Sequence, residues 1–166
     1  QFAWFFDFGE RSKAMLVGCD RNPNDLRFSL YDEKKGQLHQ IVAAGILSEG
    51  EWFHIAAVSG KGGMKLYVNG VLVGENPYDG SFSRTGSGAN NYLGLDNWAK
   101  GEILYGQIDE VRVWSIAKTE KQIRETMITT LRGDGPGLVG YWRFEDTGKE
   151  ASDSTKNHYD GELFGD

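Results

Sequence analysis

The dipeptide Asn69-Gly70 constrains the fold most, because it predicts a tight β-hairpin in the middle of the chain. A two-residue type I′ turn needs positive φ at both central positions, which Asn and Gly adopt at little cost. Short apolar runs flank the dipeptide, and a Gly-rich turn at 59–63 precedes it. The stretch Glu51–Glu75 is therefore predicted to form three antiparallel strands, whose register the short turn fixes. The expected cross-strand pairs are Val68 with Val71, Leu66 with Val73, and Tyr67 with Leu72.

Similar short apolar runs, separated by Gly, Asn and Asp, continue along the rest of the chain. Because close turns rather than helices separate these runs, the strands are expected to pair antiparallel. The one predicted helix begins at Thr119, which forms a capping box with Gln122. Ile123 and the residues four and eight positions later, Met127 and Leu131, lie on one helical face, and Gly133 is the expected stop. The sequence therefore predicts an all-β protein with one short helix in its C-terminal half.

Length, charge and cysteine content exclude several classes of protein. A chain of 166 residues can bury one sizeable core. A net charge of −6, with no more than two adjacent basic residues, argues against nucleic acid or an anionic membrane surface as a partner. No apolar run approaches the roughly 20 residues of a transmembrane helix. Cys19 is the single cysteine, so no internal disulfide is expected. Because Gln1 leads directly into a strand-like run, we expect the chain to be part of a larger multidomain protein.

Four segments occur in a characteristic order: WFHIAAV from Trp52, KLYVNGVLVG from Lys65, NYLGLD from Asn91 and GQIDEVRVW from Gly106. Together they resemble the laminin-G-like jelly rolls of the concanavalin A-like superfamily, to which the pentraxins are related. The resemblance implies an antiparallel two-sheet jelly-roll sandwich over residues 1–145. The polar extension 146–166 is expected to be a final edge strand of the same domain or the start of a linker. The resemblance also implies an extracellular or cell-surface module that recognises a glycan or an extracellular protein.

The superfamily also contains retaining glucanases, so we tested the sequence for a pair of catalytic carboxylates. Such enzymes need two carboxyl groups about 5 Å apart that flank the sugar bond. On a strand both groups must point to one face, which requires spacing i, i+2 or i, i+4. Asp109 and Glu110 are adjacent and should point to opposite faces. Glu110 and Arg112 share a face and are able to pair. We therefore predict no catalytic residues and no enzyme activity, with a degenerate glycoside hydrolase as an alternative.

Two loops have the oxygen-rich composition that calcium prefers, 20–25 and the pair Asp96-Asn97. In pentraxins, part of the calcium site follows the strand that resembles Asn91–Asp96, so Asp96 and Asn97 are the candidate metal ligands. The resemblance also places pentraxin ligands near 11–13, where this chain has two basic residues, Arg11 and Lys13. A pentraxin-type double calcium site is therefore not expected, and turn chemistry alone explains both loops equally well.

The candidate ligand-binding residues lie in two polar loops on either side of one short strand, so we expect them to be close together. Aromatic rings stack on sugar C–H groups, and amide and acid side chains replace the hydration of sugar hydroxyls. The candidates are Tyr78, Asp79, Asn90, Asn91 and Trp98. The alternative is a structural module that forms homo-oligomers through open strand edges.

Overall fold

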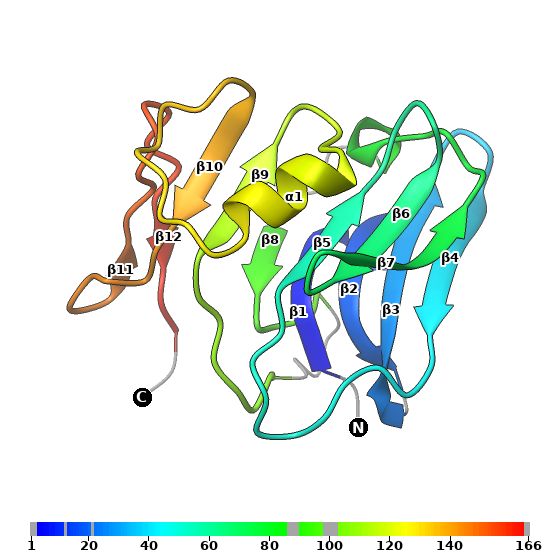
Figure 1. Ribbon diagram of the computed structural model, residues 1–166, viewed down its shortest axis with the longest axis horizontal. Helices are drawn as coiled ribbons and strands as arrows, with labels where there is room; N and C mark the ends of the chain where they lie inside the picture. The colour runs from blue at the N-terminus through cyan, green and yellow to red at the C-terminus, as the bar shows by residue number, and fades with distance from the viewer. Residues whose placement is uncertain (1–2, 12, 21, 86–89, 98–102, 165–166) are drawn as a thin grey trace. The chain divides into compact units, whose positions relative to one another are not determined.

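The computed structural model describes residues 3–11, 13–20, 22–85, 90–97 and 103–164. Every strand pair within these residues is antiparallel, and one short α-helix lies in the C-terminal half, between β9 and β10 (Figure 1). This confirms the predicted all-β fold. The chain divides into two compact units, Gln1–Gly106 and Gln107–Asp166. This division differs from the one expected at residue 145, which stays a prediction.

The N-terminal unit contains two sheets. The first has the order β4-β3-β2-β1-β8, and the second has the order β5-β6-β7. In Figure 1 the three strands of the second sheet lie in front of β2, β3 and β4. The first sheet consists of β1 (Ala3–Glu10), β2 (Lys13–Asp20), β3 (Asn22–Asp32), β4 (Gln37–Ala43) and β8 (Asn90–Leu93); the second of β5 (Ile55–Val58), β6 (Met64–Val68) and β7 (Val71–Asn76).

The core of this unit lies between the two sheets. Alternate residues of β3, among them Phe28 and Leu30, are fully buried, and they belong to one apolar cluster with Met64 and Leu66 of β6. Side chains of a strand alternate between its two faces, so the intervening residues of β3 point away from this core. We call that second side the outer face of the five-stranded sheet. The register aligns Gln40, Ser29, Leu16, Asp7 and Tyr92 in one row across it.

The predicted hairpin at Asn69-Gly70 is present, and both residues have positive φ. Val68 pairs with Val71 and Tyr67 with Leu72, as expected. The expected pairing of Leu66 with Val73 is wrong, because a register shift between Leu66 and Tyr67 places Leu66 opposite Gly74. Gly74 suits this position, since a Cβ there would come within 2.4 Å of Ile41 Cγ2. Turn chemistry alone cannot predict a bulge that depends on contact with the other sheet.

The C-terminal unit pairs β9 (Val111–Trp114) with β10 (Leu138–Trp142) and β11 (Glu150–Ala151) with β12 (Gly161–Glu162). Of the segment GQIDEVRVW, only the last four residues form strand β9. Glu110, directly before β9, has a φ of 53°, which is incompatible with an extended strand. Both β11 and β12 lie in the predicted extension 146–166, which therefore contains two short paired strands.

Helix α1 (Glu120–Thr126) begins at Thr119 with the predicted capping box. It ends at Thr126, well before the expected stop at Gly133. Three β-branched residues, at 128–130, follow the helix and disfavour its continuation. None of the described residues forms a helix long and apolar enough to cross a membrane.

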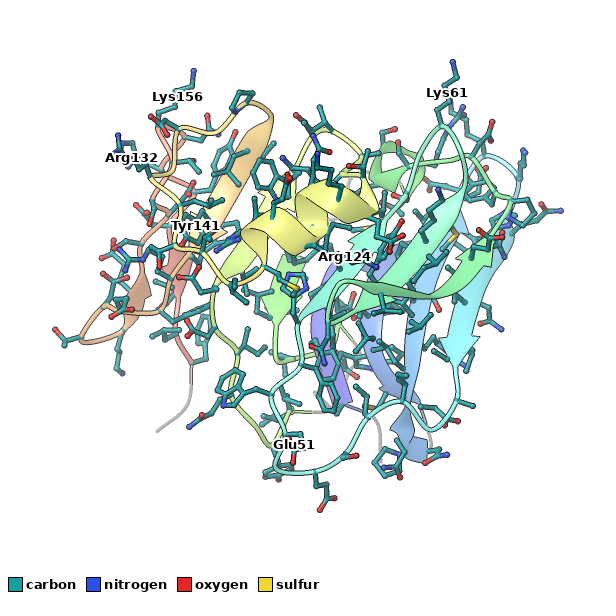
Figure 2. All side chains as sticks on the ribbon, viewed as in Figure 1. Glu51, Lys61, Arg124, Arg132, Tyr141 and Lys156 are labelled. Atoms are coloured by element: carbon teal, nitrogen blue, oxygen red, sulfur yellow. The ribbon has the colours of Figure 1, made fainter. Side chains whose placement is uncertain are left out.

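The guanidinium of Arg112 holds the chain after α1 against β9. It donates to the carbonyl oxygens of Thr126 at 2.7 Å and Thr129 at 2.5 Å, and it lies 5.0 Å from the ring centroid of Tyr141 on β10 (labelled in Figure 2). Arg112 also pairs with Glu110, as predicted, at 2.5 Å. The Tyr141 hydroxyl donates to the same carboxylate at 2.7 Å. These contacts give Glu110 and Arg112 a structural role.

Candidate functional site

The polar loop after β7 folds onto the end of the five-stranded sheet, and Tyr78 anchors its first half. The Tyr78 hydroxyl donates to Asp32 Oδ2 at 2.7 Å, and its ring stacks on His39 with 3.6 Å between centroids. Gly80 packs against the same ring, since a Cβ there would come within 2.1 Å of Tyr78 Cζ. Burial, followed by the bond to Asp32, raises the pKa of Tyr78 to about 12. Tyr78 is only 8% exposed, so the expectation that it offers an open ring to a ligand is wrong.

The second half of the loop contains the 3₁₀ turn η1 (Phe82–Arg84), which is also fixed to the sheet. The backbone N–H of Glu33 donates to the carbonyl of Arg84 at 3.0 Å. The ring of Phe82 meets that of Phe8 on β1 edge-on, with 6.1 Å between centroids. Phe82 is nevertheless 41% exposed. The described part of the loop is therefore anchored at Tyr78 and at η1, and its residue Phe82 is partly open to solvent.

Asn91 lies in the sheet next to Phe8, the residue that the ring of Phe82 contacts. It is the cross-strand partner of Phe8, so its side chain shares the face of the sheet against which Phe82 packs. Asn91 and Asp79 are both exposed. We call Phe82 and Asn91, together with Asp79 three residues before Phe82 in the same loop, the rim site. Sequence reasoning identified Asn91 and Asp79 but not Phe82, although Phe82 is an aromatic residue within a polar, Ser- and Gly-rich stretch.

Asn90 is exposed too, but it pairs with Gly9 and therefore belongs to the outer face. Asn97 also contacts that side of the sheet, through its hydrogen bonds to Asp7. Tyr78 belongs to the core between the sheets instead. The candidate residues therefore do not all share one surface, because alternate residues of β1 and β8 point to opposite faces of the sheet. The remaining candidate, Trp98, lies outside the described residues.

Asp7 is fully buried and holds the turn that follows β8. Its carboxylate accepts the backbone N–H of Asn97 and the Asn97 side-chain Nδ2–H, both at 2.9 Å. Burial raises the pKa of Asp7, the bonds from Asn97 lower it in part, and the nearby charge of Asp96 raises it further. Asp96 is itself 5% exposed. Sequence reasoning missed Asp7 because an aromatic run, FAWFFDF, masks its position on the outer face.

The contacts of the two candidate calcium loops match turn chemistry. Asn97 directs N–H groups, not oxygens, at the Asp7 carboxylate. In the other loop, Asp25 Oδ1 accepts from Asn22 Nδ2 at 3.0 Å and from the Gly45 N–H at 2.8 Å. Within the described residues no three His, Cys, Asp or Glu side chains gather as a metal site. Calcium at Asp96 and Asn97 stays a prediction.

The carboxylates considered for catalysis have other partners. Asp109 Oδ1 accepts the backbone N–H of Glu110 at 2.8 Å, and Glu110 belongs to the network with Arg112 and Tyr141. Neither residue lies in a regular strand, because β9 begins at Val111 and Glu110 has a positive φ. The pair therefore fixes the entry into β9.

A family profile described as the concanavalin A-like lectin/glucanases superfamily matches residues 3–124. The chain belongs to this superfamily. The two sheets and the antiparallel order of the N-terminal unit agree with that membership. None of the curated proteins matches the chain.

Two solved structures resemble this superfamily member. A Bacteroides ovatus protein, named as a candidate carbohydrate-binding protein, matches with a TM-score of 0.69 and 19% sequence identity. The match covers 98% of this chain and 53% of that protein, so the chain spans about half its length. A Clostridium thermocellum S-layer domain-containing protein matches with a TM-score of 0.44 and 22% identity over 76% of this chain and 63% of that one.

Proposed function

We propose that the chain is a non-catalytic carbohydrate-binding module that works outside the cell, and that the rim site contacts the glycan. The superfamily and the carbohydrate-binding name of the Bacteroides ovatus protein support this class of ligand. The single observation that carries the assignment to the rim site is Phe82, which remains 41% exposed in a loop anchored at Tyr78 and at η1.

The anchors matter because a ligand gains affinity from groups that are already ordered. Ordering a rotamer-rich side chain on binding costs about 0.5–1.5 kcal/mol. The bond from Tyr78 to Asp32 and the contact of Phe82 with Phe8 supply that order before a sugar arrives. Phe82 then offers a surface for sugar C–H groups, while Asn91 offers both a donor and an acceptor for hydroxyls.

Affinity measurements on a defined oligosaccharide panel test the proposal. We would titrate cellopentaose, xylopentaose, mannopentaose and arabinopentaose into the protein by calorimetry. Phe82→Ala should weaken binding at least tenfold. Leu72→Ala is the matched control, because Leu72 is similarly exposed at 38% but lies on β7 in the other sheet. Equal affinities for both variants, at equal melting temperatures, would reject the rim site.

Asn90 and Asn91 provide a second matched pair, because they are exposed neighbours on opposite faces of β8. Asn91→Ala should reduce affinity and Asn90→Ala should leave it unchanged. The reverse result would move the site to the outer face. Repeating the titrations with a chelator tests the calcium prediction for Asp96 and Asn97, and light scattering tests the predicted homo-oligomer.

A further inference from the structure

The outer face of the five-stranded sheet is accessible at its edge strand β4. Leu38 and Val42 point to this side and are 52% and 50% exposed, and Gln40 between them is also exposed. On the adjacent β3, Tyr31 pairs with Leu38 and Arg27 pairs with Val42, and both are partly exposed. Aromatic, amide and guanidinium groups therefore meet solvent together on two neighbouring strands.

Ser29 occupies the centre of this group. It lies between Arg27 and Tyr31 on β3, about 6.6 Å along the strand from each. Across the sheet its partners are Gln40 on β4 and Leu16 on β2. All of these neighbours have longer side chains, so the Ser29 hydroxyl lies closer to the plane of the sheet than their tips. Accordingly, Ser29 is only 2% exposed.

The Ser29 hydroxyl has no hydrogen-bond partner among the described residues. The nearby backbone offers it little, because β3 pairs with β2 on one side and with β4 on the other. An unpaired buried hydroxyl is unfavourable, and most buried polar groups in native proteins have a partner. A hydroxyl-bearing ligand on this face of the sheet would supply the missing partner.

We propose that Ser29, Tyr31 and Gln40, with Arg27 at the border, form a second contact site for a hydroxyl-rich sugar ring. A sugar hydroxyl pairs with Ser29 Oγ once the longer side chains that cover it move aside, the Tyr31 ring faces sugar C–H groups, and the Gln40 amide donates and accepts. The choice of a sugar rests on the proposed function. The location does not, because it follows from the Ser29 hydroxyl and lies on the opposite face from the rim site.

The test is a titration of ¹⁵N-labelled protein with the same four pentaoses, followed by NMR. We expect the amide signals of residues 27–31 and 38–42 to shift on addition of the pentaose that binds. Ser29→Ala should reduce the affinity of this site at least tenfold. Without sugar, Ser29→Ala should unfold at a higher temperature than the parent, because it removes an unpaired buried hydroxyl. Ser48→Ala, at an exposed position, is the control for both measurements.

The outcomes separate this inference from the proposed function. Shifts in both 27–42 and 79–91 support both sites. Shifts in 27–42 alone support the second site and reject the rim site, whereas shifts in 79–91 alone reject the second site and keep the rim site. Absence of any shift with all four pentaoses overturns both. A Ser29→Ala variant that melts lower than the parent and still binds equally well shows that the hydroxyl is satisfied by water, which also overturns the inference.

Discussion

Replacing Tyr78 by Phe removes a single oxygen from the loop that carries the rim site. The stacked contact with His39 is kept, so the change deletes only the hydroxyl that donates to Asp32 at 2.7 Å. Hydrogen bonds to charged groups contribute about 1.5–3 kcal/mol. Because the Lys35 backbone N–H still donates to Asp32, we expect Tyr78→Phe to lose about 1.5 kcal/mol, the lower limit of that range. For a chain of this size the loss lowers the melting temperature by about 3–6 °C.

The same bond makes a specific contribution to the pH dependence of stability. The Tyr78 hydroxyl, with backbone N–H groups, lowers the pKa of Asp32 below its ordinary 3.8. Its contribution is therefore present above pH 3.8 and is lost as the pH falls through the lowered value. The pKa of Tyr78 is raised from 10.0 to about 12, so its contribution is full below pH 10 and is lost as the pH rises toward 12. Tyr78→Phe should flatten the stability profile in both ranges.

Thermal unfolding between pH 2 and 12 and hydrogen exchange of residues 78–85 measure these effects. Exchange should accelerate in the loop, because one of its anchors is gone. Tyr105→Phe is the control, since Tyr105 is 85% exposed and its hydroxyl should contribute little. A Tyr78→Phe variant that melts like the Tyr105→Phe variant at neutral pH, with an unchanged profile at both extremes, would refute the assignment of Tyr78 as the anchor.

Three further changes test other parts of the structure. Gly80→Ala should destabilise the loop and weaken pentaose binding, because the new Cβ would clash with the anchored Tyr78 ring; calorimetry checks both. Gly133→Ala should destabilise strongly, since its Cβ would come within 2.0 Å of Ser154 O, whereas Gly148→Ala, also at positive φ but with open space, should cost much less in denaturant unfolding. The pKa of Asp7 is raised above 3.8, so the protein should lose stability as the pH rises through that raised value. Asp7→Asn should remove this loss, and unfolding measured at pH 4–8 would show the difference.

Much of the fold could be predicted because its signals are local. The Asn69-Gly70 turn sets the end of a hairpin, and Thr119 with Gln122 sets the start of a helix. What failed depends on tertiary contact. The register shift places Gly74 against Ile41 of the other sheet, where no larger residue fits. Helix α1 ends early where Arg112 donates to the carbonyl oxygens of Thr126 and Thr129. Neither partner is close in sequence, so no local pattern contains this information.

The candidate site was predicted less completely, for a related reason. The composition of the loop after β7 indicated a candidate site, but it could not distinguish the anchor from the exposed ring. Tyr78 and Phe82 are both aromatic residues in polar surroundings. Tyr78 is buried because it contacts Asp32 and His39, which are far away in sequence. Phe82 stays partly exposed because it meets Phe8 only edge-on.

Alternation along β1 and β8 also limits how a ligand can use this end of the molecule. Phe8 and Asn91 point to the side of the rim site, whereas Asp7 and Asn90 point to the outer face. A glycan that contacts both Asn90 and Asn91 must therefore pass around β8, the last strand of the five-stranded sheet in the described part of the chain. A short sugar on one face would depend on one of these two amides, whereas a long chain passing around the edge would depend on both. The relative effects of the two alanine variants on pentaose affinity thus report the path of the ligand as well as its location.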